Sequence, residues 1–400
     1  MARIVIVGGG IYGLTAALEL RARGHSVWLL DQGPIPHPLA ASTDISKAMR
    51  GEYGADEEYT IMIEQSRDGW LRWNQEFGET LYFEFGVTML TTEPMQPGEY
   101  EYESYAIARR RGRPIERLDS RTIAARFPAW NAQHYVDGFY SAHAGWTWSG
   151  RIVERLAARA RAAGVLIVEG IKVEHVMRSG SRVVGVSAAH GKDFAAEVVV
   201  VAAGAWTPTL LPELQPILKS TGMPVFHLKP DEPELFAPPR FVNFTADITR
   251  TGYYGFPLHP QAGVVKIAYH GPGPQIDPEH DARVVTEEET HKLRTFLGET
   301  FPALADAPIV YTRRCLYCDT IDEHFLIAAH PHLDGLVVAA GDSGHGFKFA
   351  PIYGDMVANI IEGRDDWRLD KFRWRHATEM PPGQEASRLH LAPQQDAEES

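Results

Sequence analysis

The sequence contains few cysteines and no long hydrophobic run. Among its 400 residues only Cys315 and Cys318 are cysteines, which is too few for a disulfide framework. No apolar stretch approaches the ~18 residues that a membrane-spanning helix requires. The first expected strand begins at Arg3, which leaves no room for a signal peptide. These absences predict a soluble, cytoplasmic protein with no membrane partner.

The sequence also lacks an excess of positive charge. It has 39 Lys and Arg against 52 Asp and Glu, a formal net charge of −13. Nucleic-acid binding requires a basic face opposite the phosphates, so we expect no nucleic-acid partner. The length and the 44% hydrophobic content provide for a sizeable core in two or more domains. We expect a monomer or a weak homo-oligomer.

A glycine-rich motif stands at the start of the chain. A short β-branched run, RIVIV, precedes Gly8, Gly10 and Gly13 in the spacing G-x-G-x-x-G, and a helix-period segment and the run SVWLLD follow. This order of strand, glycine turn, helix, strand and acid is the dinucleotide-binding fingerprint. The helix N-terminus would face a pyrophosphate, and Asp31 would bind a ribose. The alternative is a glycine-rich turn that binds nothing.

Pieces of one α/β domain recur along the chain. A helix is expected over 150–163, a buried strand over 198–201, and a further strand, glycine turn and helix in GLVVAAGDSGHGFKFAPIYGDMVANIIEG. In the stretches between them, apolar and polar residues alternate as they do in β-strands, for example in TLYFEFGVTML and GVVKIAYH. We therefore predict a discontinuous nucleotide domain (1–74, 149–214 and 319–375), a twice-inserted second domain (75–148 and 215–318) and a disordered tail (376–400).

Four stretches together resemble one known family. They are the N-terminal fingerprint, SKAMRGEYG, GYYGFP with GVVKIAYH, and CLYCDTIDEHFLIAAHP with GLVVAAGDSGHGFKF. In this order they resemble the monomeric sarcosine oxidase family of flavin amine oxidases, in the D-amino-acid oxidase and glycine oxidase superfamily. The group also holds pipecolate, N-methyl-amino-acid and fructosyl-amino-acid oxidases. The resemblance implies an α/β fold, with a Rossmann-like FAD-binding domain and a mostly antiparallel β-sheet substrate domain.

The resemblance further implies FAD as the cofactor, covalently attached through a thioether at Cys315. Cys318 would be its neighbour in the wall of the site. Two buried free thiols remain an alternative, whereas a zinc site would need a second C-x-x-C pair. No metal is expected. The residues implied to contact FAD are Gly8, Gly10, Ile11, Gly13, Asp31, Gln32, Ser42, Thr43, Ser46, Lys47, Val173, Ala203, Gly204, Trp206, Cys315, Gly344, His345, Gly346, Phe347 and Lys348.

Substrate-site residues follow from the same resemblance. Arg50 would bind a substrate carboxylate as a planar fork, with Lys348 as a second cation. Strand alternation places Lys266 and His270 on one face. By resemblance Lys266 lies near flavin N5 and promotes oxygen reduction, while His270 is either catalytic or structural. Two tyrosines, Tyr254 and Tyr317, would wall the cavity or belong to the core.

The implied reaction is the FAD-dependent oxidation of the C–N bond of a secondary amine or N-substituted amino acid that carries a carboxylate. Hydride passes to flavin N5, O2 reoxidises the flavin to give H2O2, and the imine hydrolyses. Lys47 stands where the family usually has arginine, which favours a substrate other than sarcosine, and opine-like or Amadori-type conjugates remain open. The alternatives are a flavin dehydrogenase that uses an electron carrier, an NAD-dependent dehydrogenase, and an FAD-binding protein without activity.

Overall fold

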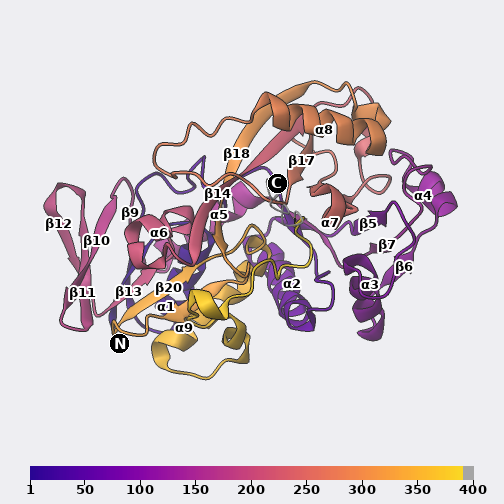
Figure 1. The fold of residues 1–400 in the computed structure, drawn as a ribbon. Helices are drawn as coiled ribbons and strands as arrows, with labels where there is room; N and C mark the ends of the chain where they lie inside the picture. The colour runs from indigo at the N-terminus through magenta and orange to yellow at the C-terminus, as the bar shows by residue number, and fades with distance from the viewer. Residues whose placement is uncertain (391–400) are drawn as a thin grey trace, which may run out of the picture.

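The computed structural model describes residues 1–390 and is built around two large β-sheets (Figure 1). The first sheet has six strands, and its members come from the beginning, the middle and the late part of the chain. Five of them run parallel, while the edge strand β19 is antiparallel. In spatial order they are β19 (Leu326–Ala329), β20 (Leu336–Ala340), β13 (Val198–Val201), β1 (Arg3–Val7), β2 (Ser26–Leu30) and β9 (Leu166–Val168).

Apolar helices cover this sheet. Helix α1 (Ile11–Ala22) follows the glycine turn directly and packs against α5 (Ser149–Ala162) and α9 (Ala350–Glu362). The long helix α2 (Glu57–Phe77) packs against α9 as well. Buried side chains of these helices and of the sheet form one continuous core. The carboxyl ends of the parallel strands therefore meet at one edge, where ligands bind in such sheets.

The second large sheet has eight strands and is antiparallel except between β15 and β5. Its two longest strands, β14 and β18, pair along most of their length. The strands are β18 (Ile309–Thr320), β14 (Leu218–Leu228), β17 (Val265–Tyr269), β16 (Tyr253–Gly255), β15 (Asn243–Ala246), β5 (Val87–Thr91), β7 (Asp137–Ser141) and β6 (Ile115–Arg117). Helices α3 (Tyr100–Arg110), α4 (Ser120–Arg126), α7 (Ile248–Thr251) and α8 (Glu287–Thr300) accompany this sheet (Figure 1).

Two three-stranded sheets complete the described fold. One contains β3 (Lys47–Met49), β8 (Gly145–Thr147) and β4 (Tyr82–Phe83). The other, β10 (Val173–Ser179), β11 (Arg182–Ala188) and β12 (Lys192–Ala195), projects at the far left of Figure 1. The short helix α6 (Thr207–Leu210) follows β13. None of the helices described here combines the length and the apolar character that crossing a membrane would demand.

The predicted α/β fold with a Rossmann-like sheet and a mostly antiparallel second sheet is confirmed. Strand β13 has the predicted bounds, and the helix predicted after the second glycine turn begins at Ala350, after a 3-10 turn over Phe347–Phe349. The domain boundaries proposed from the sequence remain a prediction.

The segment that follows α9 differs from the expected disordered tail. Residues 376–390 pack onto the protein, and Glu385, Ser387 and Arg388 are buried. Polar composition misled the prediction because these side chains find charged partners inside the molecule rather than water. The rest of the predicted tail, 391–400, lies outside the described residues.

Candidate functional site

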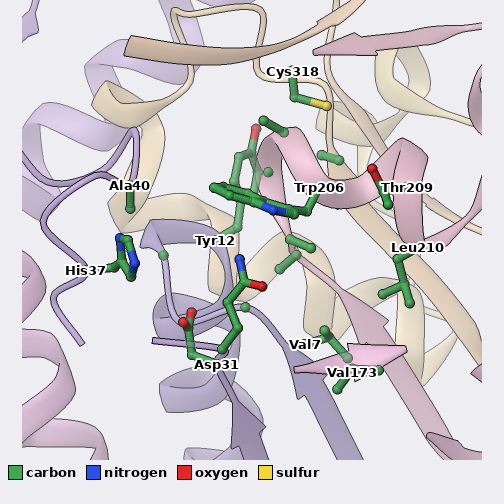
Figure 2. Close-up of a pocket in the computed structure, with 18 of the residues that line it drawn as sticks. Val7, Tyr12, Asp31, His37, Ala40, Val173, Trp206, Thr209, Leu210 and Cys318 are labelled. Atoms are coloured by element: carbon green, nitrogen blue, oxygen red, sulfur yellow. The ribbon is translucent and has the colours of Figure 1, made fainter. Parts of the chain in front are cut away.

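A large cavity opens at the carboxyl edge of the six-stranded sheet, with a volume of about 520 Å³. Asp31 and His37 lie on one side of it and Thr209 and Leu210 on the other, with Trp206 reaching between them (Figure 2). Ten of the residues predicted to contact the cofactor line this cavity. They are Gly8, Gly10, Ile11, Asp31, Gln32, Ser42, Val173, Ala203, Gly204 and Trp206.

Close backbone packing forms the floor of this cavity. A Cβ at Gly13 would lie 1.9 Å from the carbonyl oxygen of Gly8, and a Cβ at Gly8 would lie 2.3 Å from the carbonyl oxygen of Ala202. The Asp31 carboxylate accepts hydrogen bonds from the amides of Gly9 at 2.7 Å and Gly33 at 2.8 Å. The glycine turn is thus fixed in shape, with α1 beginning at its end.

Two cavity residues, Tyr12 and Asp342, were missed by the sequence reasoning, whereas Cys318 is predicted from the sequence in the wall of the site. Cys318 lines the cavity, as do Tyr12 and Asp342 (Figure 2 labels the first two). Burial, reinforced by the charge of Asp319, raises the pKa of Asp342 to about 6. The sequence signal for Asp342 was its place in the glycine turn after β20, which resembles the turn after β1.

A second, smaller cavity of about 50 Å³ lies beside the first. The loop that follows β20 joins the two, because Asp342 lines the large cavity and Gly344 the small one. Segments far apart in the sequence form its walls, and many of their side chains are cationic or can become so. The lining residues are Lys47, Ala48, Arg50, Ile248, Tyr254, His270, Gly344, His345, Phe347 and Lys348.

Lys348 is buried and points its ammonium group at neutral oxygens. Its Nζ donates to the Tyr53 hydroxyl and to the His345 carbonyl, each at 2.9 Å. Burial, together with the charge of Arg50, lowers the pKa of Lys348 well below its ordinary value. An anionic ligand in the cavity would favour the protonated form again.

Arg50 is buried and lines the same small cavity. Its Nη1 donates to the Tyr100 hydroxyl at 2.7 Å and to the Glu52 carbonyl. Its Nη2 donates to Ser387 Oγ at 2.7 Å. The direct hydrogen-bond partners of Arg50 are thus uncharged oxygens, and the nearby Glu385 carboxylate is reached only through Ser387.

His270 lies at the end of β17 among aromatic rings. Its ring centroid is 6.3 Å from that of Tyr254 and 6.1 Å from that of Tyr317. The Tyr317 ring covers Gly344 so closely that a Cβ there would lie 2.0 Å from the ring. Burial lowers the pKa of His270, against the opposing effect of Glu385, whose carboxylate is 2.9 Å from His270 Nε2. Tyr254 thus lines the small cavity, and Tyr317 packs against Gly344 in its wall.

Lys266 forms a buried ion pair behind this cavity. Its Nζ lies 2.6 Å from Asp44 Oδ2 and donates to the Ser46 carbonyl at 2.6 Å. Burial lowers the pKa of Lys266 to about 8, although Asp44 acts in the opposite direction. Burial raises the pKa of Asp44, but the charge of Lys266 and the His227 ring, whose Nε2 lies 3.6 Å from Asp44 Oδ1, hold it well below its usual value.

The two cysteines on β18 point to different surroundings, as strand alternation requires. The Cys315 Sγ lies 3.8 Å from Lys47 Nζ and packs with Tyr317. Cys318 lines the large cavity instead. Both thiols are buried and free.

Of the predicted substrate residues, the small cavity gathers Arg50, Tyr254, His270 and Lys348, whereas Lys266 and Tyr317 line neither cavity. The predicted cofactor residues are not all on a cavity either. Lys47, Gly344, His345, Phe347 and Lys348 line the small cavity, whereas Gly13, Thr43, Ser46, Cys315 and Gly346 line neither. Their backbone or side chains support the walls. Asp44, Glu385 and Ser387 were missed. Asp44 had a weak signal in its position before SKAMR, and the other two had none.

The chain belongs to the FAD dependent oxidoreductase (DAO) family, whose model matches residues 3–360. A monomeric sarcosine oxidase of Bacillus sp. (strain B-0618) is 27% identical, covering 92% of this chain and 94% of that protein. An L-saccharopine oxidase of Schizosaccharomyces pombe is 28% identical, covering 93% of each. In fold, the chain is similar to the fructosamine oxidase Amadoriase II of Aspergillus fumigatus, with a TM-score of 0.82 at 24% identity, covering 98% of this chain and 94% of that one.

The large cavity fits the cofactor that the family name states. Its 520 Å³ lies within the range of about 300–1,000 Å³ usual for ligand sites. The glycine turn leaves backbone amides at a helix N-terminus next to the cavity, an arrangement that binds phosphates. Another wall of the cavity is formed by Ala202, Ala203 and Gly204, whose small side chains let a ligand approach the backbone.

Proposed function

We propose that this protein oxidises the C–N bond of a secondary amine or N-substituted amino acid that carries a carboxylate, with FAD as the electron acceptor. The observation that carries the proposal is the small cavity beside the cofactor cavity, where Arg50, His270 and Lys348 converge. Buried cations are costly without a counter-charge, so a site that gathers them favours an anionic ligand. The named activities of the sarcosine and saccharopine oxidase relatives support the same reaction class.

Each residue of the cavity has a definable task in this reaction. Arg50 and Lys348 would hold the substrate carboxylate, which would also restore the proton on Lys348. Tyr254 and Tyr317 would pack on the substrate and keep water away from the reacting carbon. Bound FAD supplies the acceptor for the hydride of that carbon. The substrate nitrogen must be neutral to lose hydride, and the cations around it favour the deprotonated amine.

The final electron acceptor is proposed to be O2. Lys266 supports this, because a fixed positive charge stabilises the negative charge that develops on reduced oxygen. A dehydrogenase that passes electrons to a carrier is the second candidate. The Asp44 carboxylate 2.6 Å from Lys266 favours it, since a paired ammonium offers a weaker field. Peroxide release in air, compared with anaerobic dye reduction, separates the two.

Covalent attachment of FAD is proposed at Cys315, on the resemblance of RRCLYCDT to the family motif. Cys318 is the rival, because it lines the large cavity. Acid denaturation followed by filtration tests the proposal. Yellow colour should stay with the protein in the wild type and in Cys318→Ala, and should pass into the filtrate in Cys315→Ala. The reverse pattern would assign the bond to Cys318, and free flavin in the wild type would exclude attachment.

The substrate itself is best found by screening. Lys47, in place of the family's arginine, favours a substrate other than sarcosine, and the similarity to a saccharopine oxidase and to a fructosamine oxidase makes opine-like and Amadori-type amino acids the first to try. We expect one of these classes to bleach the flavin absorbance under anaerobic conditions. A yellow protein that no amine bleaches would indicate an FAD-binding protein without this activity. The monomeric or weakly oligomeric state and the cytoplasmic location remain predictions.

A further inference from the structure

Residues 383–390 form a strap across the substrate side of the molecule. The Leu389 amide donates to the His270 carbonyl at 3.1 Å, which fixes the strap to the end of β17. Arg388 is buried and pairs with Asp319 of β18 at 2.8 Å. The strap is therefore held on both sides by the strands that carry the site.

The strap brings a carboxylate into the interior. The Glu385 side chain is fully buried, and its Oε2 lies 2.9 Å from His270 Nε2. Ser387 Oγ lies 2.7 Å and 2.8 Å from the two carboxylate oxygens and donates its proton between them. Burial raises the pKa of Glu385, but His270, His345 and Arg50 together hold it well below its usual value.

Glu385 is linked to Arg50 through Ser387. The same Ser387 Oγ that donates to Glu385 accepts a hydrogen bond from Arg50 Nη2 at 2.7 Å. A continuous chain thus runs from Arg50 through Ser387 and Glu385 to His270. Arg50 and His270 both line the small cavity, so the chain spans the residues proposed to meet the substrate.

We propose that Glu385 is a positioning and specificity-determining residue of the substrate site: it holds the His270 ring through Nε2 and, as a buried negative charge beside Arg50, sets how strongly the site binds an anionic group. Its placement beside the cavity rests on the geometry alone. The identification of that anionic group with a substrate carboxylate rests on the proposed function.

Two physical effects follow from this arrangement. A carboxylate bonded to one ring nitrogen of a histidine fixes the ring orientation and determines which nitrogen faces the cavity. A fixed negative charge also repels a second one nearby. Glu385 therefore tempers the attraction of Arg50 and Lys348, so that a bound carboxylate can leave again with the product.

The test compares two carboxylate-to-amide changes in the same segment of the holoenzyme. Glu385→Gln removes the buried charge, and Glu379→Gln, at an exposed position, is the matched control. Acetate is the probe, and its binding is followed by the change in flavin absorbance. We expect Glu385→Gln to bind acetate ~10-fold more tightly than the wild type, the scale of one lost charge repulsion across a protein interior. Glu379→Gln should match the wild type.

An unchanged acetate dissociation constant in Glu385→Gln, or no acetate binding in any of the proteins, would overturn the proposal. Should Glu385→Gln not fold, Ser387→Ala provides the second variant. It releases Arg50 Nη2 and loosens the carboxylate, so it should bind acetate ~3-fold more tightly, and weaker binding would count against the proposal.

Hydrogen exchange in the wild type gives a measurement without substitution. If the strap completes the site, the Leu389 amide should keep its protection when acetate binds. Loss of protection would show that acetate displaces the strap, so that Glu385 would be a removable plug, and the proposal would be wrong. Since acetate is not oxidised, these results are independent of whether any amine proves to be a substrate.

Discussion

The two cavities are constructed in different ways. The large one lies at the edge of the six-stranded sheet, and two of its walls, the glycine turn and the 202–204 turn, each follow a single strand and consist of backbone and small side chains. The small one is formed by long, charged or aromatic side chains from separate parts of the chain, with the strap behind them. Both cavities join distant segments of the chain, but the first is closed by contiguous backbone turns and the second by individual side chains. Substitutions in the first cavity should therefore either abolish FAD binding or leave it intact. Substitutions in the second should change ligand binding or reaction rates by graded amounts.

The largest effect is expected at Gly13. Any Cβ there would lie 1.9 Å from the Gly8 carbonyl oxygen. Because the clashing atom belongs to the backbone, it cannot move aside as a flexible side chain could. Gly13→Ala should purify without FAD, measured as the ratio of flavin to protein absorbance. The control is Gly298→Ala, where a Cβ meets nothing within 4 Å and which should gain about 0.5–1 kcal/mol of stability. If Gly13→Ala retained a full complement of FAD, the glycine turn would be able to accommodate a Cβ, and the prediction would be wrong.

Next in size is Lys266→Met. The loss of a buried positive charge should slow reoxidation of the reduced enzyme by O2 by ~10²-fold, the scale of a lost electrostatic group. Anaerobic reduction by substrate should change much less. Stopped-flow measurement of each half-reaction checks this, and an equal fall in both would make Lys266 a folding or binding residue.

A similar or smaller effect is expected for Arg50→Ala. Binding of an unreactive carboxylate such as acetate should weaken by ~2–3 kcal/mol, the scale of a charged hydrogen bond. Acetamide serves as the uncharged control and should bind Arg50→Ala and the wild type alike. Equal binding of acetate and acetamide by the wild type would contradict a carboxylate site.

The smallest effect is a displaced pH profile. The pKa of Lys266 is lowered to about 8, so its ammonium form dominates below that pH and is lost as the pH rises through it. Reoxidation by O2 should therefore be fast below pH ~8 and decline above it. Because Asp44 raises the pKa of Lys266, Asp44→Asn should move this decline to lower pH, with a loss under ~10-fold at neutral pH. If reoxidation by Asp44→Asn declined at the same pH as in the wild type, the decline would be due to the titration of a group other than Lys266.

The sequence predicted the local parts of the protein well. The fingerprint around Gly8 and the strand at 198–201 are contiguous runs whose period and punctuation determine their conformation, and both were confirmed. The family resemblance assigned Arg50, His270 and Lys348 to one site, because no sequence periodicity connects these residues. Glu385 could not be predicted, because its polar surroundings in the sequence are typical of a solvated tail and its histidine partner lies 115 residues away.

The position of Glu385 also has a consequence for biosynthesis. The ribosome makes the chain from its N-terminus, and folding begins on the emerged part. Every strand of both large sheets precedes Glu385 in the sequence, so the cofactor cavity can form while the strap is still being translated. A chain synthesised only as far as Asp342 therefore contains every lining residue of the cofactor cavity but still lacks Glu385, Ser387 and Arg388, which complete the substrate side.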